Sequence, residues 1–136
     1  LVGESGTLMM QCNGVKTNGD RRFVGTDSGF HHLIRKPLYN AHHEIVNASN
    51  IEDRTFSYDV CGNICESTDF FAHNRDISHI REGDILAVKD VGAYGFCMSS
   101  NYNTRPRPAE VMVDEDGARL IRMRETIEDL LRGQVG

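Results

Sequence analysis

Turn-forming residues divide this sequence into short stretches, and this division restricts the possible folds more than any other feature. Apolar or alternating runs between the turns predict strands at residues 7–12, 22–27, 44–48, 55–61, 85–90, 110–114 and 118–123. The first run is expected to end at Asn13-Gly14. Asn18-Gly19 and Glu115-Asp116-Gly117 have the composition of hairpin turns. Many short strands joined by turns are typical of a β-barrel or a β-sandwich.

The C-terminal end carries the one helix that the sequence predicts. Thr126 can cap its start, and Glu128 and Asp129 suit the positive end of the helix dipole. Gly133 can stop the helix one turn later. The expected fold class is therefore mainly β with a short C-terminal helix.

Composition narrows the class of protein. The 136 residues, 39% of them apolar and 26% charged, suit one domain with a single core. No apolar run approaches the ~20 residues of a membrane span. A net charge of -5 and scattered basic residues argue against a nucleic-acid partner. Four cysteines and no signal-peptide pattern indicate free thiols in the cytoplasm. The start at Leu1, without Met and in a strand-like run, leads us to expect a piece of a longer polypeptide.

Two segments depart from ordinary strand-and-turn patterning. In residues 92–111, two glycines flank Tyr94, a Ser/Asn-rich run follows, and Arg105-Pro106-Arg107-Pro108 leads into an apolar strand. Glycine lets a backbone approach a ligand closely, so a tyrosine between glycines indicates a side chain held out from a bend. The second segment is Cys65-Glu66-Ser67-Thr68-Asp69-Phe70.

Together with residues 33–39 (Leu-Ile-Arg-Lys-Pro-Leu-Tyr) and His43-Glu44-Ile45, these segments resemble the C-terminal domain of the diaminopimelate decarboxylases. These are pyridoxal-phosphate enzymes of the alanine-racemase-like fold type, and the resemblance covers nearly the whole chain. It implies a Greek-key-like β-barrel over residues 1–136, a single C-terminal domain. The α/β barrel that binds the cofactor, with its lysine, would lie outside this fragment.

The resemblance also implies an activity for the full-length protein. It would convert meso-diaminopimelate to L-lysine and carbon dioxide in lysine biosynthesis, as a cytoplasmic homodimer with shared active sites. Pyridoxal 5'-phosphate would act as the electron sink. No lysine of this chain lies in a matching motif, so the fragment alone is expected to be inactive.

Cys65 matches the catalytic cysteine of the family, which donates a proton to the substrate in the partner subunit's site. A thiol suits this role because it gives up a proton near neutral pH. Glu66 would bind the distal ammonium group of the substrate through charge-assisted hydrogen bonds. The alternatives are a small packing residue for Cys65 and an exposed strand residue for Glu66.

Arg35 and Tyr39 match an Arg-x-x-x-Tyr pair that holds the distal carboxylate of the substrate. A guanidinium group fits a carboxylate with two parallel hydrogen bonds. Lys36-Pro37 stands where the family more often has Pro-Ala, which could shift the local bend. Tyr94 matches the tyrosine that reaches toward both the cofactor phosphate and the substrate. A surface arginine beside a core tyrosine is the alternative interpretation of Arg35 and Tyr39.

Other polar residues favour structural roles. Cys61, Cys65 and His73 could hold a metal only if Gly62-Asn63 forms a turn, because residues four apart on a strand lie roughly 13 Å apart. The histidine pairs at 31–32 and 42–43 each offer one ligand at most, because neighbouring strand residues point oppositely. No metal site is therefore expected. The prolines beside Arg105 and Arg107 favour a rigid turn or a dimer contact over a phosphate clamp.

Two other functions compete with this interpretation. The first is a related ornithine-, arginine- or carboxynorspermidine-type decarboxylase, which would not need Arg35 and Tyr39 to bind a distal carboxylate. The second is a non-catalytic binding module of the same fold, which would fold well alone and bind a partner other than the cofactor.

Overall fold

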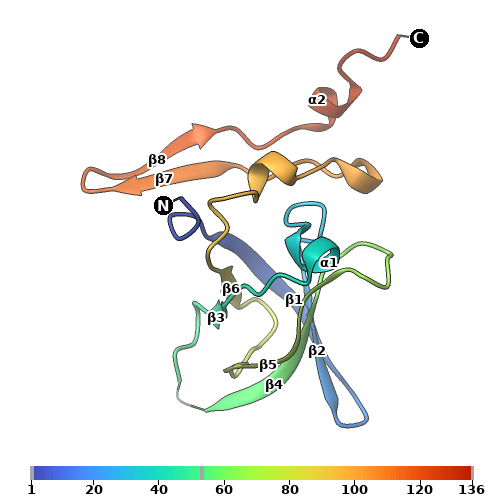
Figure 1. Ribbon diagram of the computed structural model, residues 1–136, viewed down its shortest axis with the longest axis vertical. Helices are drawn as coiled ribbons and strands as arrows, with labels where there is room; N and C mark the ends of the chain where they lie inside the picture. Colours follow the sequence, from blue (N-terminus) through green and yellow to red (C-terminus); the bar gives the residue numbers. More distant parts are fainter. Residues whose placement is uncertain (1, 53, 136) are drawn as a thin grey trace. The chain divides into compact units, whose positions relative to one another are not determined.

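The computed structural model describes residues 2–52 and 54–135 (Figure 1), and these fall into two compact units. The barrel unit extends to Ser99, and the hairpin unit begins at Ser100. Among the described residues, no helix is long and apolar enough to cross a membrane.

The barrel unit is built around one six-stranded sheet. Its strands are β1 (Leu8–Asn18), β2 (Arg21–Thr26), β3 (Ile45–Asn47), β4 (Thr55–Cys61), β5 (Phe70–Ser78) and β6 (Ile85–Val88). They lie in the order β3-β6-β1-β2-β4-β5, and every neighbouring pair is antiparallel except β2 and β4, which are parallel. The edge strands β3 and β5 also contact one another, so the sheet curls until it nearly closes (Figure 1). The predicted mainly-β, barrel-like fold is confirmed.

Alternating side chains of the strands fill the barrel. Met10 and Cys12 of β1, Val24 of β2 and Leu86 of β6 are each at most 2% exposed, and they belong to one apolar cluster. Successive side chains of a strand point to opposite faces, so every second residue is buried when one face of the strand packs against the core. Tyr58 is also buried, and its hydroxyl accepts a hydrogen bond from a backbone N–H, so that the polar end of the ring is satisfied.

All seven predicted strands are present, but β1 does not end where its sequence indicated. It continues through Asn13-Gly14 to Asn18, and its pairing with β2 shifts between Cys12 and Gly14. Asn13 donates its side-chain amide to the Thr26 carbonyl at 3.1 Å. The Asn-Gly pair therefore makes a bulge within the strand, because the ladder resumes directly after it. The predicted hairpin turn at Asn18-Gly19 is confirmed.

Four elements were not predicted: β5, α1 and the short 3-10 helices η1 (Phe96–Met98) and η2 (Tyr102–Thr104). Strand β5 carries the polar run His73-Asn74-Arg75-Asp76, which obscures its alternation, and Asn74 has a positive φ of 47°. The helix α1 (Arg35–Tyr39) contains Pro37. Proline is tolerated there because it lies in the first turn, where backbone N–H groups need no partner within the helix.

The hairpin unit agrees closely with the sequence pattern. Strands β7 (Glu110–Asp114) and β8 (Gly117–Arg122) form an antiparallel hairpin, and α2 (Ile127–Leu131) follows. The Thr126 side chain caps α2 by accepting a hydrogen bond from the Asp129 N–H, and the Asp129 side chain accepts one from the Thr126 N–H. The predicted cap is therefore confirmed.

Candidate functional site

Helix α1 places two of the predicted residues on one face. Arg35 and Tyr39 are four apart, so on a helical turn their side chains are neighbours. The Arg35 guanidinium carbon lies 6.0 Å from the centroid of the Tyr39 ring. The helix ends at Asn40, which has left-handed backbone angles and whose N–H bonds to the Lys36 carbonyl.

Tyr94 approaches the same guanidinium from another loop. The centroid of its ring lies 5.7 Å from the Arg35 guanidinium carbon, within the range of a cation–π contact. Tyr94 has a φ of 58°, unusual for a residue with a side chain, and 61% of the residue is exposed. The prediction of a tyrosine projecting from a bend is therefore confirmed.

The turn that carries Tyr94 is locked to the N-terminal loop. The N–H of Val91 donates to the Gly6 carbonyl at 3.0 Å, and that of Gly92 donates to the Gly3 carbonyl at 2.9 Å. A Cβ atom at Gly92 would lie 1.9 Å from the Val2 carbonyl oxygen, so any larger residue must push the two loops apart. Such a rigid support maintains the backbone of Tyr94 in its strained conformation.

Arg35, Tyr39 and Tyr94 form what we call the arginine–tyrosine cluster. Its guanidinium carries several N–H donors, and each phenol adds an O–H donor. Both tyrosines are 61% exposed, so their rings remain accessible to a ligand. A cation beside neutral donors is suited to an anionic oxygen group such as a carboxylate or a phosphate.

Cys65 and Glu66 lie on a second loop of the barrel unit, between β4 and β5, and both are exposed. Asp69 is only 3% exposed, and it holds this loop from the inside. Its Oδ1 accepts from the Phe30 N–H and its Oδ2 from the Ile64 N–H, each at 2.7 Å. The loop is therefore held to residues 28–30 by a buried carboxylate.

Gly62 makes this arrangement possible. A Cβ atom at that position would lie 2.2 Å from Asp69 Oδ2, so a side chain there would displace the carboxylate. The sequence interpretation quoted Asp69 only as part of a motif and missed its positioning role. The signal was present, because an Asp after a glycine-containing turn can accept hydrogen bonds from backbone N–H groups of that turn.

Two buried or partly buried carboxylates outside these loops have shifted acidities. Burial opposes ionisation of Asp59, but hydrogen bonds from the Asn74 N–H and from Arg21 hold its pKa below the usual range. In the hairpin unit, the backbone N–H and the guanidinium of Arg107 lower the pKa of Glu125. Arg107 therefore holds the segment before β7 to Glu125, which follows β8 in the sequence.

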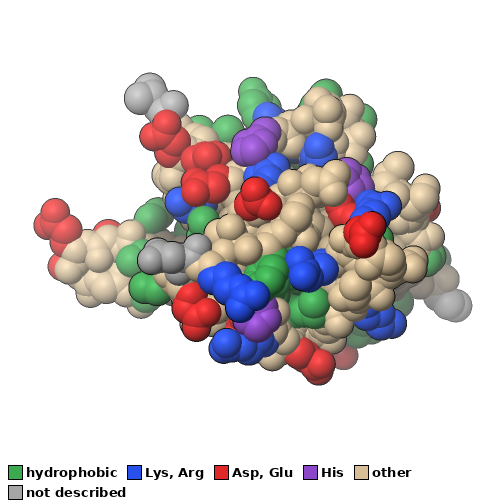
Figure 2. Space-filling model, turned by 90° about the horizontal axis from the view of Figure 1, so that it is seen from below, with side chains coloured by type: hydrophobic (Ala, Val, Ile, Leu, Met, Phe, Trp, Pro, Cys, Tyr) green, Lys and Arg blue, Asp and Glu red, His purple; other side chains and the backbone are tan. Residues whose placement is uncertain are grey.

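The histidines have structural partners. His31 is 1% exposed and His43 is 5% exposed, and the His43 ring contacts the Lys89 carbonyl at 3.0 Å. The Arg75 guanidinium contacts the His42 ring. Within residues 2–52 and 54–135, no group of three His, Cys, Asp or Glu side chains is arranged to hold a metal ion. On the face drawn in Figure 2, basic and acidic side chains are interspersed.

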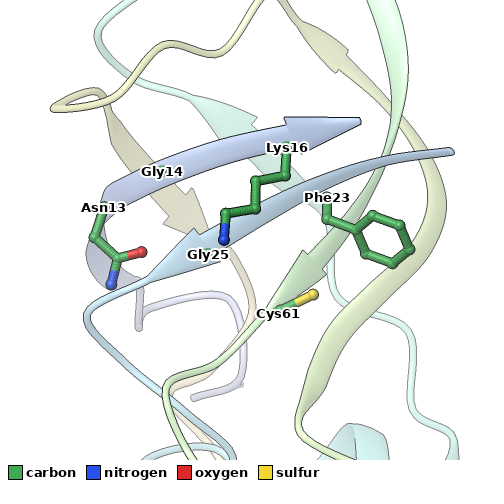
Figure 3. A pocket seen from close by; sticks show the side chains of 6 residues that line it. All are labelled: Asn13, Gly14, Lys16, Phe23, Gly25 and Cys61. Carbon is green, nitrogen blue, oxygen red and sulfur yellow. The ribbon is translucent and has the colours of Figure 1, made fainter. Parts of the chain in front are cut away.

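A hollow of about 330 Å³ lies beside the bulge of β1 (Figure 3). Lys16, Phe23 and Cys61 border it from three adjacent strands. Burial raises the pKa of the Cys61 thiol to about 11, so this thiol is protonated at neutral pH. That state is unsuited to nucleophilic chemistry or metal binding.

Comparison with known proteins assigns this architecture to a family. A curated relative from Methanothermobacter thermautotrophicus, named diaminopimelate decarboxylase, is 46% identical over 135 residues, which are 98% of this chain and 31% of the relative. One of the same name from Aquifex aeolicus is 42% identical over 128 residues, 94% of this chain and 30% of the relative.

A solved structure shares the fold. The diaminopimelate decarboxylase of M. jannaschii in complex with L-lysine has a TM-score of 0.94 and 34% identity, covering 98% of this chain and 31% of that one. The present chain thus spans about a third of the length of these relatives. Residues 2–92 match the family described as pyridoxal-dependent decarboxylase, C-terminal sheet domain. The chain belongs to the family of C-terminal sheet domains of pyridoxal-dependent decarboxylases.

Proposed function

We propose that this chain is the C-terminal domain of a pyridoxal-phosphate-dependent diaminopimelate decarboxylase. The full-length protein would convert meso-diaminopimelate to L-lysine and carbon dioxide. The observation that supports this most is the arginine–tyrosine cluster, because it offers a cation and two phenols to an anionic group. The 46% identity to a relative of that name supports the same substrate.

The cofactor would be attached outside this chain. The sequence has three lysines, Lys16, Lys36 and Lys89. Lys36 bonds to Asn40 and Lys89 pairs with Glu44. We place the attachment lysine in an α/β barrel elsewhere in the full-length protein. When bound, pyridoxal phosphate supplies the electron sink for breaking the bond to the carboxylate. Tyr94 is exposed and lies beside a cation, which fits a role in holding the phosphate and the substrate.

The substrate would be recognised at its distal end, away from the bond that breaks. Arg35 and Tyr39 would bind the distal carboxylate, and Glu66 would bind the distal ammonium group. Ornithine and lysine carry a distal ammonium group but no distal carboxylate. An arginine left without an anion in a closed site is costly, so these residues would favour diaminopimelate.

Cys65 would complete the reaction. When carbon dioxide leaves, the substrate carbon requires a proton, and the Cys65 thiol would donate it and become a thiolate. The exposure of the Cys65 loop is compatible with reaching into the site of a second subunit. We therefore propose a cytoplasmic homodimer in which each active site takes Cys65 from the partner chain.

Replacing Cys65 tests the proton-donor role. In the full-length protein, Cys65→Ala should lower kcat on the order of 10²-fold or more with little change in substrate binding. Cys97→Ala is a matched control, because Cys97 is another exposed cysteine of the barrel unit. Turnover of Cys65→Ala within a few-fold of the wild type would make Cys65 a packing residue.

Mixing two inactive variants tests the shared site. Cys65→Ala should regain activity when it forms heterodimers with a variant that lacks the cofactor lysine, because one of the two mixed sites is then intact. Demonstrated heterodimers without activity would place Cys65 in the active site of its own subunit.

Replacing Arg35 tests the substrate. Arg35→Met should strongly lower kcat/KM for meso-diaminopimelate, because only diaminopimelate has the distal carboxylate. The ratio of kcat/KM for meso-diaminopimelate to kcat/KM for L-lysine should therefore fall. Arg22→Met is the control, since Arg22 stacks on Phe56 instead. Equal proportional losses for both substrates would assign Arg35 to the fold and favour the ornithine-type alternative.

A further inference from the structure

The arginine–tyrosine cluster is assembled from two segments of the barrel unit that begin side by side. Strands β3 and β6 form an antiparallel pair (Figure 1). The Lys89 N–H extends this pairing by donating to the Glu44 carbonyl at 2.9 Å. Beyond that bond the two segments diverge. One runs back to α1, and the other runs on to Tyr94.

The side chain of His43 makes one further hydrogen bond between these segments. Its Nδ1 lies 3.0 Å from the Lys89 carbonyl oxygen. A carbonyl oxygen can only accept, so Nδ1 carries a proton and donates it to this bond. His43 is 5% exposed, which shields the bond from competing water. Within the described part of the chain, no hydrogen bond joins residues 35–42 to residues 90–94, so the His43 bond is the last one before the segments separate.

The backbone of His43 is held by a third element. Arg75 of β5 donates from Nη1 to the His43 carbonyl at 2.8 Å, and its guanidinium also contacts the His42 ring. Strand β5 contacts α1 as well. Because Arg75 fixes the backbone of His43, the imidazole has little freedom to leave the Lys89 carbonyl. The bond between His43 and Lys89 is therefore a well-defined link.

The chain turns toward Tyr94 directly after this link. Asp90 has a φ of 61°, in the left-handed region that residues with a side chain seldom adopt. The carbonyl that His43 holds belongs to the residue just before that turn. A rotation of the Lys89 peptide would therefore move the turn and the tyrosine that follows it. His43 lies four positions after Tyr39, and Lys89 lies five positions before Tyr94, so the link is near both parts of the cluster.

We propose that His43 is a positioning residue that sets the separation of Arg35 and Tyr94. This rests on the proposed function, in which Arg35 and Tyr39 bind the distal carboxylate and Tyr94 contacts the substrate. The centroid of the Tyr94 ring lies 5.7 Å from the Arg35 guanidinium carbon, close to the outer limit of a cation–π contact. A shift of about 1 Å would break this contact, and displacements of that size strongly weaken the binding of an oriented group.

Two substitutions of His43 in the full-length protein separate positioning from a purely structural role. His43→Leu removes the Nδ1 donor. It should raise KM for meso-diaminopimelate about tenfold and change kcat less than about threefold, because the cluster holds the end of the substrate that does not react. His43→Asn should restore KM to within about threefold of the wild type, since an asparagine amide N–H can take the place of Nδ1–H. Should His43→Leu be insoluble, His43→Gln replaces it, because its amide reaches the position of Nε2 instead.

Fluorine NMR monitors the cluster without substrate. A 3-fluorotyrosine is placed at position 94 of the full-length protein. Its resonance should shift by more than its linewidth in His43→Leu and return in His43→Asn, because the ring first leaves and then regains the Arg35 guanidinium. Asn50→Ala is the matched control. Asn50 also donates a side-chain amide to a backbone carbonyl, that of His79 at 2.8 Å, but outside the two segments. It should lower the Tm and leave both KM and the resonance at their wild-type values.

Each outcome decides between the alternatives. A wild-type value of either KM or the resonance in His43→Leu would overturn the proposal, and so would a failure of His43→Asn to restore both. Equal changes in Asn50→Ala would reduce His43 to a structural residue. Decarboxylation of meso-diaminopimelate by the wild type is measured separately. An inactive wild type whose resonance responds as expected refutes only the proposed function, and an active enzyme without that response refutes only the role of His43.

Discussion

The barrel unit and the hairpin unit are both mainly β, but they obtain their stability in different ways. The barrel buries a continuous apolar cluster, so its loops can expose polar residues such as Cys65 and Tyr94 at little risk to the fold. The hairpin unit has regular strands, ion pairs and a capped helix, but no buried residue among those described. Good local signals therefore produce secondary structure, whereas independent stability requires a core.

The largest expected effect tests the core of the barrel directly. Val60 of β4 is fully buried, so Val60→Asp should destabilise the full-length protein by roughly 4 kcal/mol or more and prevent soluble expression. Val111→Asp in the hairpin should leave a folded protein, since Val111 is 55% exposed in this chain. Yield and circular dichroism compare the two variants. A cooperative, wild-type-like melt of Val60→Asp would contradict the contrast between the units.

Asp69 tests whether a loop on the barrel depends on a buried anchor. Asp69→Ala leaves one buried and one partly buried N–H group without their acceptor, which should cost about 2–4 kcal/mol in the free energy of unfolding. Urea unfolding of the full-length protein measures this loss, and kcat should fall as well because the loop carries Cys65. Glu66→Gln serves as the stability control, because Glu66 is an exposed residue of the same loop. Unchanged stability in Asp69→Ala would mean that the loop is held by other contacts.

Gly92 provides a smaller, more local test. Gly92→Ala should cost about 1–3 kcal/mol, because its Cβ atom would overlap the Val2 carbonyl oxygen. It should also raise KM for the substrate by displacing Tyr94. Gly14→Ala is the matched control, since no atom lies within 4 Å of a Cβ atom at that position. If both variants have the same Tm and KM, the N-terminal loop does not support the Tyr94 turn.

The smallest effect is the response to acid, and it again compares the two units. Asp59 and Glu125 have pKa values lowered in the folded state. Each therefore adds stability above its unfolded pKa, and this stability is lost as the pH falls through the folded pKa. Unfolding free energies measured below about pH 4.5 should decline less steeply in Asp59→Asn and Glu125→Gln than in the wild type. Added salt should weaken the Glu125 effect more, because Glu125 is 24% exposed and Asp59 only 2%.

Features that depend on interactions between residues close in sequence were predicted correctly, whereas features that depend on distant residues were not. The strands at 55–61 and 110–114 were predicted with their observed bounds, and so was the cap of α2, because all three depend on local alternation or local hydrogen bonds. The bulge at Asn13-Gly14 was mistaken for a strand end. Its local composition is that of a turn, and only the pairing of β1 with β2 and β6 keeps the chain extended.

The candidate site shows the same division. The spacing of Arg35 and Tyr39 is a helical spacing, but five residues around a proline are too few to predict a helix. The approach of Tyr94 to Arg35 joins residues 59 positions apart, which no local pattern encodes. The residues were recognised through family-like motifs, and their roles remain predictions for the experiments above.

The order of strands also determines how the chain can acquire its structure. β6 lies between β3 and β1, so Leu8 pairs with Val88 across most of the barrel unit. During synthesis, the β1–β2 and β4–β5 pairs can form early, but the sheet stays open until residue 88 has left the ribosome. Such distant pairings slow folding to milliseconds or seconds in small domains. Until then β1 has an unpaired edge, so the nascent chain is most prone to aggregate just before its sixth strand arrives.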